Sequence, residues 1–123
     1  MNIIDSSAWI EYFNDGANAS EFAGAIEDPA TLVVPSWTIY EVYRRMASPN
    51  EKLAARAVDL MLQGRVVDLT ATLAINAAAL SLETGLAAAD SIILATARAN
   101  DATLWTQDAH FEGLPGVEFR ARK

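Results

Sequence analysis

The sequence Asn2-Ile3-Ile4-Asp5-Ser6-Ser7 joins a short apolar strand to a helix through an acid. The strand ends on Asp5, and the two serines open a helical stretch over residues 6–13 that carries Trp9 and Phe13. A strand that feeds directly into a helix is the repeating unit of α/β proteins with parallel sheets. The same order is therefore expected further along the chain.

Strands and helices are expected to alternate over the rest of the sequence. Further strands are predicted at residues 31–34, 65–69 and 103–106, with an edge strand at 117–119. Helices are predicted at residues 18–27, 36–47, from after 50 to 63, from 70 or 72 to 84 with a cap at Gly85, and 87–100, with a helical turn at 108–112. This pattern predicts a single α/β domain over residues 1–123. We expect a three-layer α/β/α arrangement with a mostly parallel sheet of four to five strands and helices on both faces.

Composition excludes several kinds of site. The chain has 123 residues, no cysteine and one histidine, so disulfides, thiolate metal sites and multi-histidine zinc sites are ruled out. Any metal is expected to be held by oxygen. No uninterrupted apolar run reaches the roughly 18 residues of a membrane helix, and the N-terminus has no basic segment ahead of an apolar one. We expect a cytoplasmic protein with no membrane association.

The net charge of −7 opposes nucleic-acid binding by bulk attraction, which normally needs a basic surface. That objection weakens if several acids cluster around bound divalent cations, because the cations reverse the local charge where a phosphate would lie. The positions of the acids therefore decide whether a phosphate-handling function is compatible with this chain.

Three acids map to one edge of the predicted sheet. Asp5 ends the first strand, Glu41 lies in the second turn of the helix after the second strand, and Asp108 follows the strand at 103–106. Ligands of open parallel sheets bind beyond the carboxyl ends of the strands, which is this edge. Asp90 lies in the first turn of a helix that follows another helix, so topology alone places it less clearly.

Each acid also has an explanation in helix capping. Asp5 and Asp108 suit N-cap positions, Asp90 suits a first helical turn, and Glu41 completes a Thr38-x-x-Glu41 capping box. Two arguments favour a metal site instead. Asp5 and Asp90 stand among apolar neighbours, where an unpaired charge is costly. Four converging carboxylates would also repel one another unless a hard cation such as Mg²⁺ or Mn²⁺ lay between them.

The sequence resembles the PIN domains, and among them the VapC-like toxins of bacterial and archaeal type II toxin–antitoxin pairs. The resemblance rests on Ile4-Asp5-Ser6-Ser7, on Pro35 followed by Glu41, on Ala89-Asp90-Ser91-Ile92-Ile93-Leu94-Ala95-Thr96-Ala97, and on Trp105-Thr106-Gln107-Asp108 with Phe111. Each motif is weak alone, but their order and spacing over nearly the whole chain are specific. The resemblance implies a PIN-like fold.

The resemblance also implies a site and a reaction. It assigns Asp5, Glu41, Asp90 and Asp108 as the catalytic, metal-binding acids of a Mg²⁺-dependent endoribonuclease, with Mn²⁺ as a possible substitute. Ser7 and Thr106 occupy hydroxyl positions beside these acids, where they are expected to hydrogen-bond the carboxylates or a metal-bound water. A metal-activated water would hydrolyse the RNA phosphodiester bond in line, giving 3′-hydroxyl and 5′-phosphate ends. The implied partners are an RNA substrate, a cognate antitoxin that blocks the acidic pocket, and a second copy in a homodimer.

Other residues carry weaker predictions. Arg44 and Arg45 follow Glu41 within one helical turn and are the candidate RNA-binding cations. His110 is interpreted as a surface turn residue and not as a base, because nothing flanks it in a relay pattern. Aromatic residues are frequent on the first and third helices and are expected to supply the core and to line a groove for a partner helix. These rings are Trp9, Tyr12, Phe13, Trp37, Tyr40 and Tyr43.

Two alternative functions share some of these sequence features. A phosphate-accepting signalling domain shares the length, acidity and sheet type, but it needs a lysine after a late strand, and the only lysines are Lys52 and Lys123. A catalytically inactive binding module of the PIN fold is the other alternative, against which the complete set of four acids argues. A Mg²⁺-dependent, EDTA-sensitive ribonuclease assay separates these alternatives from the enzyme.

Overall fold

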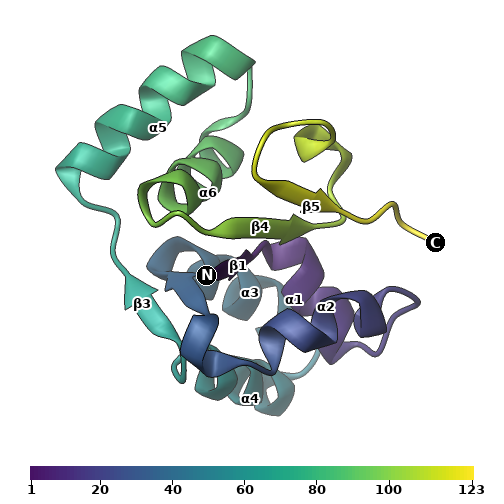
Figure 1. Ribbon diagram of the computed structural model, residues 1–123. Coiled ribbons are helices and arrows are strands. Elements are labelled where there is room, and N and C mark those ends of the chain that lie inside the picture. The colour runs from purple at the N-terminus through teal and green to yellow at the C-terminus, as the bar shows by residue number, and fades with distance from the viewer.

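A computed structural model describes residues 1–123 (Figure 1). The elements in chain order are β1 (Asn2–Ile4), α1 (Ser6–Phe13), α2 (Ala19–Ile26), the 3₁₀ turn η1 (Pro29–Thr31), β2 (Val33–Pro35), α3 (Ser36–Ala47), α4 (Glu51–Met61), β3 (Arg65–Val67), α5 (Ala71–Thr84), α6 (Ala88–Ala99), β4 (Thr103–Thr106), the 3₁₀ turn η2 (Ala109–Phe111) and β5 (Val117–Phe119). The predicted α/β alternation is confirmed.

All strand pairs are parallel, but the strands form two groups. β4 pairs with both β1 and β5 in a three-stranded sheet, and β2 pairs with β3 in a two-stranded sheet. One isolated parallel bridge, between Asn2 and Leu32, connects the groups. Strand pairing between the two groups is limited to this bridge, which uses Leu32, the residue before β2. The five predicted strands are therefore present, although they are divided between two sheets.

Neighbouring residues of a strand enter different cores, as the two-residue period of a strand requires. Ile3 and Val33 belong to a core that α5 and α6 cover, whereas Ile4 and Val34 belong to a second core that α1, α2, α3 and α4 cover. All four side chains are at most 1% exposed. Figure 1 shows α5 and α6 on one side of β1 and β4 and the other four helices on the opposite side. This is the predicted three-layer arrangement.

One strand boundary and one capping assignment differ from the sequence-based expectation. The predicted strand at 31–34 is displaced to Val33–Pro35, because Pro29–Thr31 forms a 3₁₀ turn first. α3 begins at Ser36 with Pro35 at its N-cap position, so Thr38 lies inside the helix. Thr38 therefore cannot be the N-cap residue of a Thr38-x-x-Glu41 capping box, and that explanation of Glu41 is wrong.

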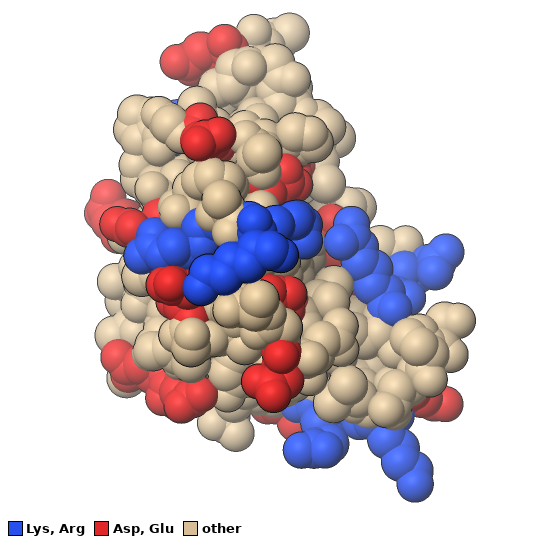
Figure 2. Space-filling model, turned by 90° about the vertical axis from the view of Figure 1, so that its right-hand side faces the viewer, with Lys and Arg blue, Asp and Glu red and all other residues tan.

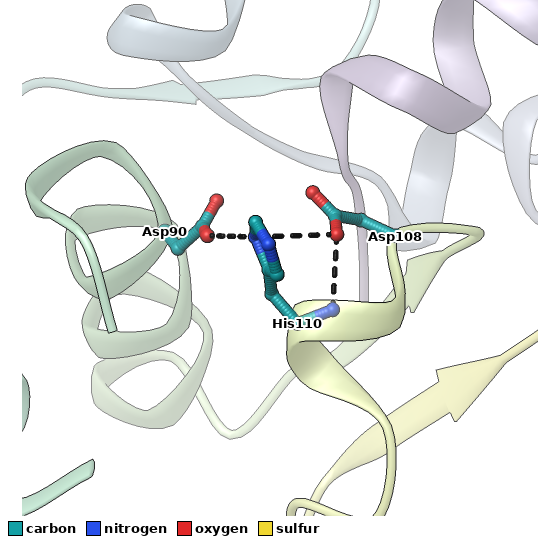
Figure 3. Close-up of side chains that lie close together, drawn as sticks. All are labelled: Asp90, Asp108 and His110. Carbon is teal, nitrogen blue, oxygen red and sulfur yellow. Dashed lines mark hydrogen bonds and ion pairs between the residues drawn. The ribbon is translucent and has the colours of Figure 1, made fainter. Parts of the chain in front are cut away.

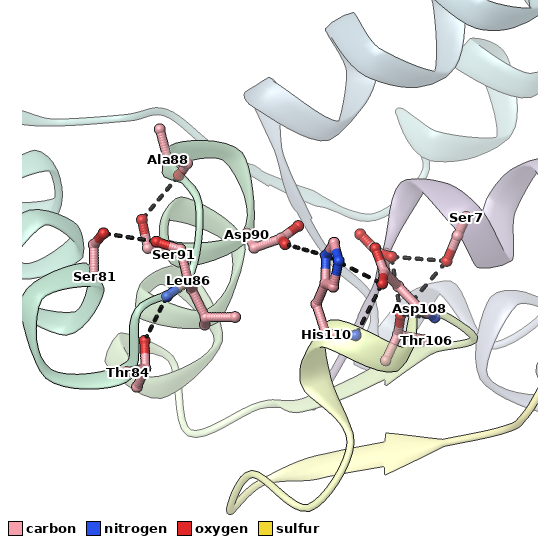
Figure 4. Close-up of polar contacts among 11 residues, drawn as sticks. Ser7, Ser81, Thr84, Leu86, Ala88, Asp90, Ser91, Thr106, Asp108 and His110 are labelled. Atoms are coloured by element: carbon pink, nitrogen blue, oxygen red, sulfur yellow. Dashed lines mark hydrogen bonds and ion pairs between the residues drawn. The ribbon is translucent and has the colours of Figure 1, made fainter.

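The corner between α5 and α6 is fixed by local hydrogen bonds. Gly85 closes α5 with φ +77°, the left-handed conformation predicted for it. Ser81 Oγ donates to the Leu86 carbonyl at 2.6 Å, and Leu86 N–H donates to Thr84 Oγ1 at 3.2 Å (Figure 4). No single helix has the length and apolar character to cross a membrane; only α5 and α6 together do, and they are bent by 113°.

Candidate functional site

The carboxyl ends of β1 and β4 bring the first and last acids to one edge. Asp5 follows β1, and its N–H donates to the Trp105 carbonyl of β4 at 2.9 Å. Asp108 follows β4 by two residues. Asp90 reaches the same edge because α6 leads by a short connection into β4 and must run back along the sheet, so its first turn lies near the strand's carboxyl end.

Asp5 is buried, with 5% of its surface exposed. Ser7 Oγ donates to Asp5 Oδ2 at 2.7 Å, and Thr106 Oγ1 donates to the same oxygen at 2.9 Å. Thr106 Oγ1 in turn accepts the N–H of Asp108 at 2.9 Å, which links the first and last acids (Figure 4). Asp5 occupies the N-cap position of α1 but its side chain makes no capping bond there. Its carboxylate is therefore directed to the sheet edge by two hydroxyls.

Burial dominates the electrostatics of Asp5. Loss of solvent raises the pKa of the Asp5 carboxyl group, and the negative charge of Asp108 raises it further. The hydrogen bonds from Ser7 and Thr106 oppose this shift because they favour the ionised form. An ionised Asp5 is thus stabilised by its two hydroxyl partners and by the backbone N–H of Ser6.

Glu41 faces the same space from α3. Partial burial, followed by repulsion from Asp5, raises the pKa of the half-buried Glu41 carboxyl group to about 7. Asp90 raises this pKa further, whereas the positive charge of Arg45 lowers it. These interactions place Glu41 within electrostatic reach of two other acids of the predicted quartet.

Asp90 and Asp108 meet on either side of an imidazole ring. His110 Nδ1 lies 3.1 Å from Asp90 Oδ2 and 3.4 Å from Asp108 Oδ1 (Figure 3). Burial raises the pKa of the Asp90 carboxyl group most, the hydrogen bond to His110 lowers it, and the charges of Asp108 and Asp5 raise it. Each of the four acids at this edge of the sheet therefore interacts electrostatically with at least one other.

The sequence interpretation of His110 was incomplete. The residue does lie in the exposed turn η2, with 70% of its side chain accessible, but its ring contacts two acids of the quartet. The sequence did contain a signal for this contact, because His110 follows Asp108 by two positions. A residue at that position of a short turn folds back toward the capping acid. Asp108 also fulfils its capping role, because its Oδ1 accepts the His110 N–H at 3.0 Å.

The residues present fit a divalent cation. Ligand atoms of Asp90, Asp108 and His110 all lie within 4.8 Å of one another. Burial, together with repulsion between the carboxylates, raises the pKa values of Asp5, Glu41 and Asp90. Carboxylate oxygens are the preferred donors of Mg²⁺ and Mn²⁺. A cation among them would offset the mutual repulsion.

The space beside these ligands is open to a larger molecule. A cavity of about 360 Å³ is lined by Thr84, Gly85, Leu86, Ala87, Asp90 and His110. Of the two candidate RNA-binding cations, both are exposed at the end of α3, but only Arg45 acts on the pKa of Glu41. Arg45 is therefore the candidate whose charge acts on the acidic site.

Two basic side chains near the C-terminal end are paired with acids. Figure 2 shows Lys and Arg side chains in a band across the face on which the C-terminal end lies, with acidic side chains above and below. Near that end, Arg120 forms ion pairs with Glu21 and Glu118 at 3.3 and 3.1 Å, and Lys123 lies 4.0 Å from Glu21. These tail cations are partly neutralised on the protein surface.

The aromatic residues divide between different surfaces. Tyr12 and Phe13 line a groove of about 620 Å³ between α1, α2 and α4, together with Leu53 and Arg56. The rings of α3 do not line this groove. The reason is that α4, and not α3, borders the outer face of α1 and α2 at this point.

Solved structures share this fold. A toxin–antitoxin complex from Klebsiella pneumoniae is 24% identical, with a TM-score of 0.82 and 96% of each chain covered. Mycobacterium tuberculosis VapC20, described as a sarcin–ricin loop cleaving toxin, is 19% identical, with a TM-score of 0.76 over 94% of this chain and 95% of that chain. VapBC2 from Rickettsia felis, bound to a promoter DNA fragment, is 15% identical, with a TM-score of 0.74 over 99% and 98%.

At the level of sequence, no match was found among curated proteins. The model of one family, the PIN domain, matches residues 3–117, which include all four acids of the candidate site. The family resemblance seen in the motifs is thereby confirmed over most of the chain, and the chain belongs to the PIN domain family.

Proposed function

We propose that residues 1–123 form a single PIN domain that acts as a metal-dependent endoribonuclease, the toxin of a toxin–antitoxin pair in the cytoplasm. One observation carries the proposal: Asp5, Asp90 and Asp108, which are far apart in sequence, meet at the carboxyl edge of the sheet. Thr106 links Asp5 to Asp108, and His110 lies between Asp90 and Asp108. The charges of Asp5 and Asp90 also act on Glu41 at this edge. The similarity of the fold to solved toxins supports the biological role.

The four carboxylates would hold Mg²⁺, or Mn²⁺ in its place. When bound, such a cation activates water for attack on phosphorus and offsets the charge of the phosphate. Ser7 and Thr106 hold the Asp5 carboxylate in one orientation through its Oδ2. In-line attack breaks the bond to the 3′ oxygen and leaves a 5′-phosphate.

The direct test is cleavage of RNA by purified protein with Mg²⁺ and with EDTA. We expect Asp5→Asn and Asp90→Asn to abolish cleavage, since each removes charge from the cation site. Asp59→Asn, an exposed acid on α4, is the matched control and is expected to cleave as the wild type does. Cleavage that survives EDTA, or that survives either site substitution, would contradict the proposal.

The antitoxin partner is proposed to occupy the groove formed by α1, α2 and α4. Its wall combines the rings of Tyr12 and Phe13 with Leu53, and Arg56 and Glu27 lie at its margin. Such a surface suits the apolar face of an amphipathic helix. Leu53→Glu is expected to weaken capture of an antitoxin encoded next to this chain, while cleavage of RNA by the free toxin is retained.

A homodimer is proposed to form through α5. This helix packs mainly on α6, and it exposes Ile75 and Leu82 at 70% and 91% of their surface. A cavity of about 440 Å³ with mostly apolar walls lies between α5 and α6. Exposed apolar side chains beside an apolar cavity are typical of a contact surface between proteins.

A further inference from the structure

The only histidine of the chain lies inside the acidic site. His110 Nδ1 faces Asp90 and Asp108, and the ring makes no other hydrogen bond. Its backbone is held in place on both sides, because Asp108 accepts the His110 N–H and the next residue, Phe111, is fully buried in the core. An exposed ring on a fixed backbone is accessible from solvent and is also correctly placed for binding.

The spacing of the three donor atoms matches that of ligands sharing one ion. Two ligands at right angles on bonds of roughly 2.1 Å lie about 3.0 Å apart. The Nδ1 atom of His110 lies 3.1 Å from an oxygen of Asp90 and 3.4 Å from an oxygen of Asp108. Ligand atoms of the three residues lie within 4.8 Å of one another. The imidazole thus occupies the position of a third ligand and not that of a distant neighbour.

We propose that His110 supplies a nitrogen ligand to the cation that Asp90 and Asp108 hold. This inference rests on the proposed metal site and adds a donor outside the four acids. Mg²⁺ strongly prefers oxygen, whereas imidazole is a good ligand for first-row transition ions, and affinity for a site with nitrogen increases from Mn²⁺ to Co²⁺. The mixed site therefore favours Mn²⁺ and Co²⁺ over Mg²⁺ more than four carboxylates alone would.

The first experiment detects the bond directly. Tag-free protein is loaded with Mn²⁺, and electron spin-echo spectra are recorded for the wild type and for His110→Ala. Because the chain has no second histidine, an imidazole ¹⁴N coupling can come only from His110. We expect this coupling in the wild type and its loss in His110→Ala. Identical spectra for the two proteins would overturn the proposal.

The second experiment measures selectivity by calorimetric titration with Co²⁺ and with Mg²⁺. Loss of a ligand is expected to weaken Co²⁺ binding at least about tenfold, since even partners of ligands contribute roughly 10–100-fold. Mg²⁺ binding should change much less. Ala109→Ser, in the same turn, is the matched control and should leave both affinities unchanged. Equal losses of Co²⁺ and Mg²⁺ affinity in His110→Ala would overturn the proposal.

The outcomes separate this inference from the proposed function. A wild type that binds Mn²⁺, with binding lost in Asp90→Asn but without ¹⁴N coupling, would overturn the nitrogen ligand and leave the carboxylate site intact. A wild type that binds no divalent cation would overturn both. His110 is exposed, so His110→Ala is expected to fold normally, and its circular dichroism spectrum checks this.

Discussion

Thr106 donates its hydroxyl hydrogen to Asp5 Oδ2 at 2.9 Å while accepting the backbone N–H of Asp108 at 2.9 Å. One fully buried hydroxyl thus connects the first and last acids of the site. Asp5 follows β1 and Asp108 follows β4, so this contact can form only when the two strands are correctly paired.

Thr106→Val should therefore destabilise the fold. The substitution keeps the shape of the side chain but leaves a buried N–H without a partner and removes one donor from Asp5, at a cost of about 1–3 kcal/mol. Urea unfolding measures the change. Thr103→Val in the same strand is the control, because the Thr103 side chain makes no hydrogen bond. Equal effects of the two substitutions would contradict this role of Thr106.

The metal-free protein should lose stability as the pH rises. The pKa of Glu41 is raised from 4.5 to about 7 on folding, so the folded state binds more protons than the unfolded state between these values. The contribution of Glu41 to the free energy of unfolding is largest below pH 4.5, and it is lost as the pH rises through about 7. Glu41→Gln should remove about 1 kcal/mol of this dependence, given solvent screening of a half-exposed group. Denaturation in EDTA at pH 5–8 tests it, with Glu51→Gln as control; an unchanged pH profile in Glu41→Gln would refute the assignment.

A divalent cation should stabilise the fold, and more so at higher pH. Protons and cations compete for carboxylates whose pKa values are raised, so binding strengthens as Glu41 loses its proton. The melting temperature with Mn²⁺ is expected to rise more at pH 8 than at pH 6. A shift of the same size in Asp90→Asn would mean that the cation binds elsewhere.

Arg45 should contribute more to RNA binding than Arg44. The positive charge of Arg45 lowers the pKa of Glu41, and Arg44 is not among the main causes of that shift, although both arginines are exposed. In an inactive Asp5→Asn background, Arg45→Ala should weaken RNA binding and reduce the salt dependence of binding by about one contact. Arg44→Ala is the paired control. Fluorescence anisotropy at several salt concentrations measures both; a larger loss in Arg44→Ala would reverse the assignment.

Substitutions on α5 should separate dimers into monomers. Leu82→Glu places a charge on an exposed apolar side chain of the proposed interface, and a charge there would be buried without a partner. Sedimentation velocity should show a smaller species than the wild type, with RNA cleavage per chain as a check of folding. Glu83→Gln on the same helix is the control. A wild type that sediments as a monomer at high concentration would exclude the dimer.

Local pattern was sufficient for much of the fold. The bounds of α3, β4 and β5 follow from apolar periodicity, and Gly85 ends α5 as its lack of a side chain suggests. The strand near Thr31 was displaced because proline at residue 29 favours a turn over an extended start. Short-range signals therefore determined elements well where no competing turn was present.

The site was less accessible from sequence, because it depends on distances between segments. Asp90 and His110 are 20 residues apart and meet only through the packing of α6 beside η2. The capping box that explained Glu41 is wrong because Thr38 lies inside α3 and not at its N-cap position. Motif order indicated which acids belong together, while the contact between imidazole and carboxylates required the three-dimensional arrangement.

The division of β1 between two cores has a consequence for how the acids are assembled. Like charges cannot gather by themselves, so the free energy that holds them together must come from elsewhere in the fold. Ile3 and Ile4 are anchored in opposite layers, and a shift of β1 by one residue would expel both from their cores. Packing in the two apolar cores thus fixes the position of Asp5, and of its charge, before any cation binds.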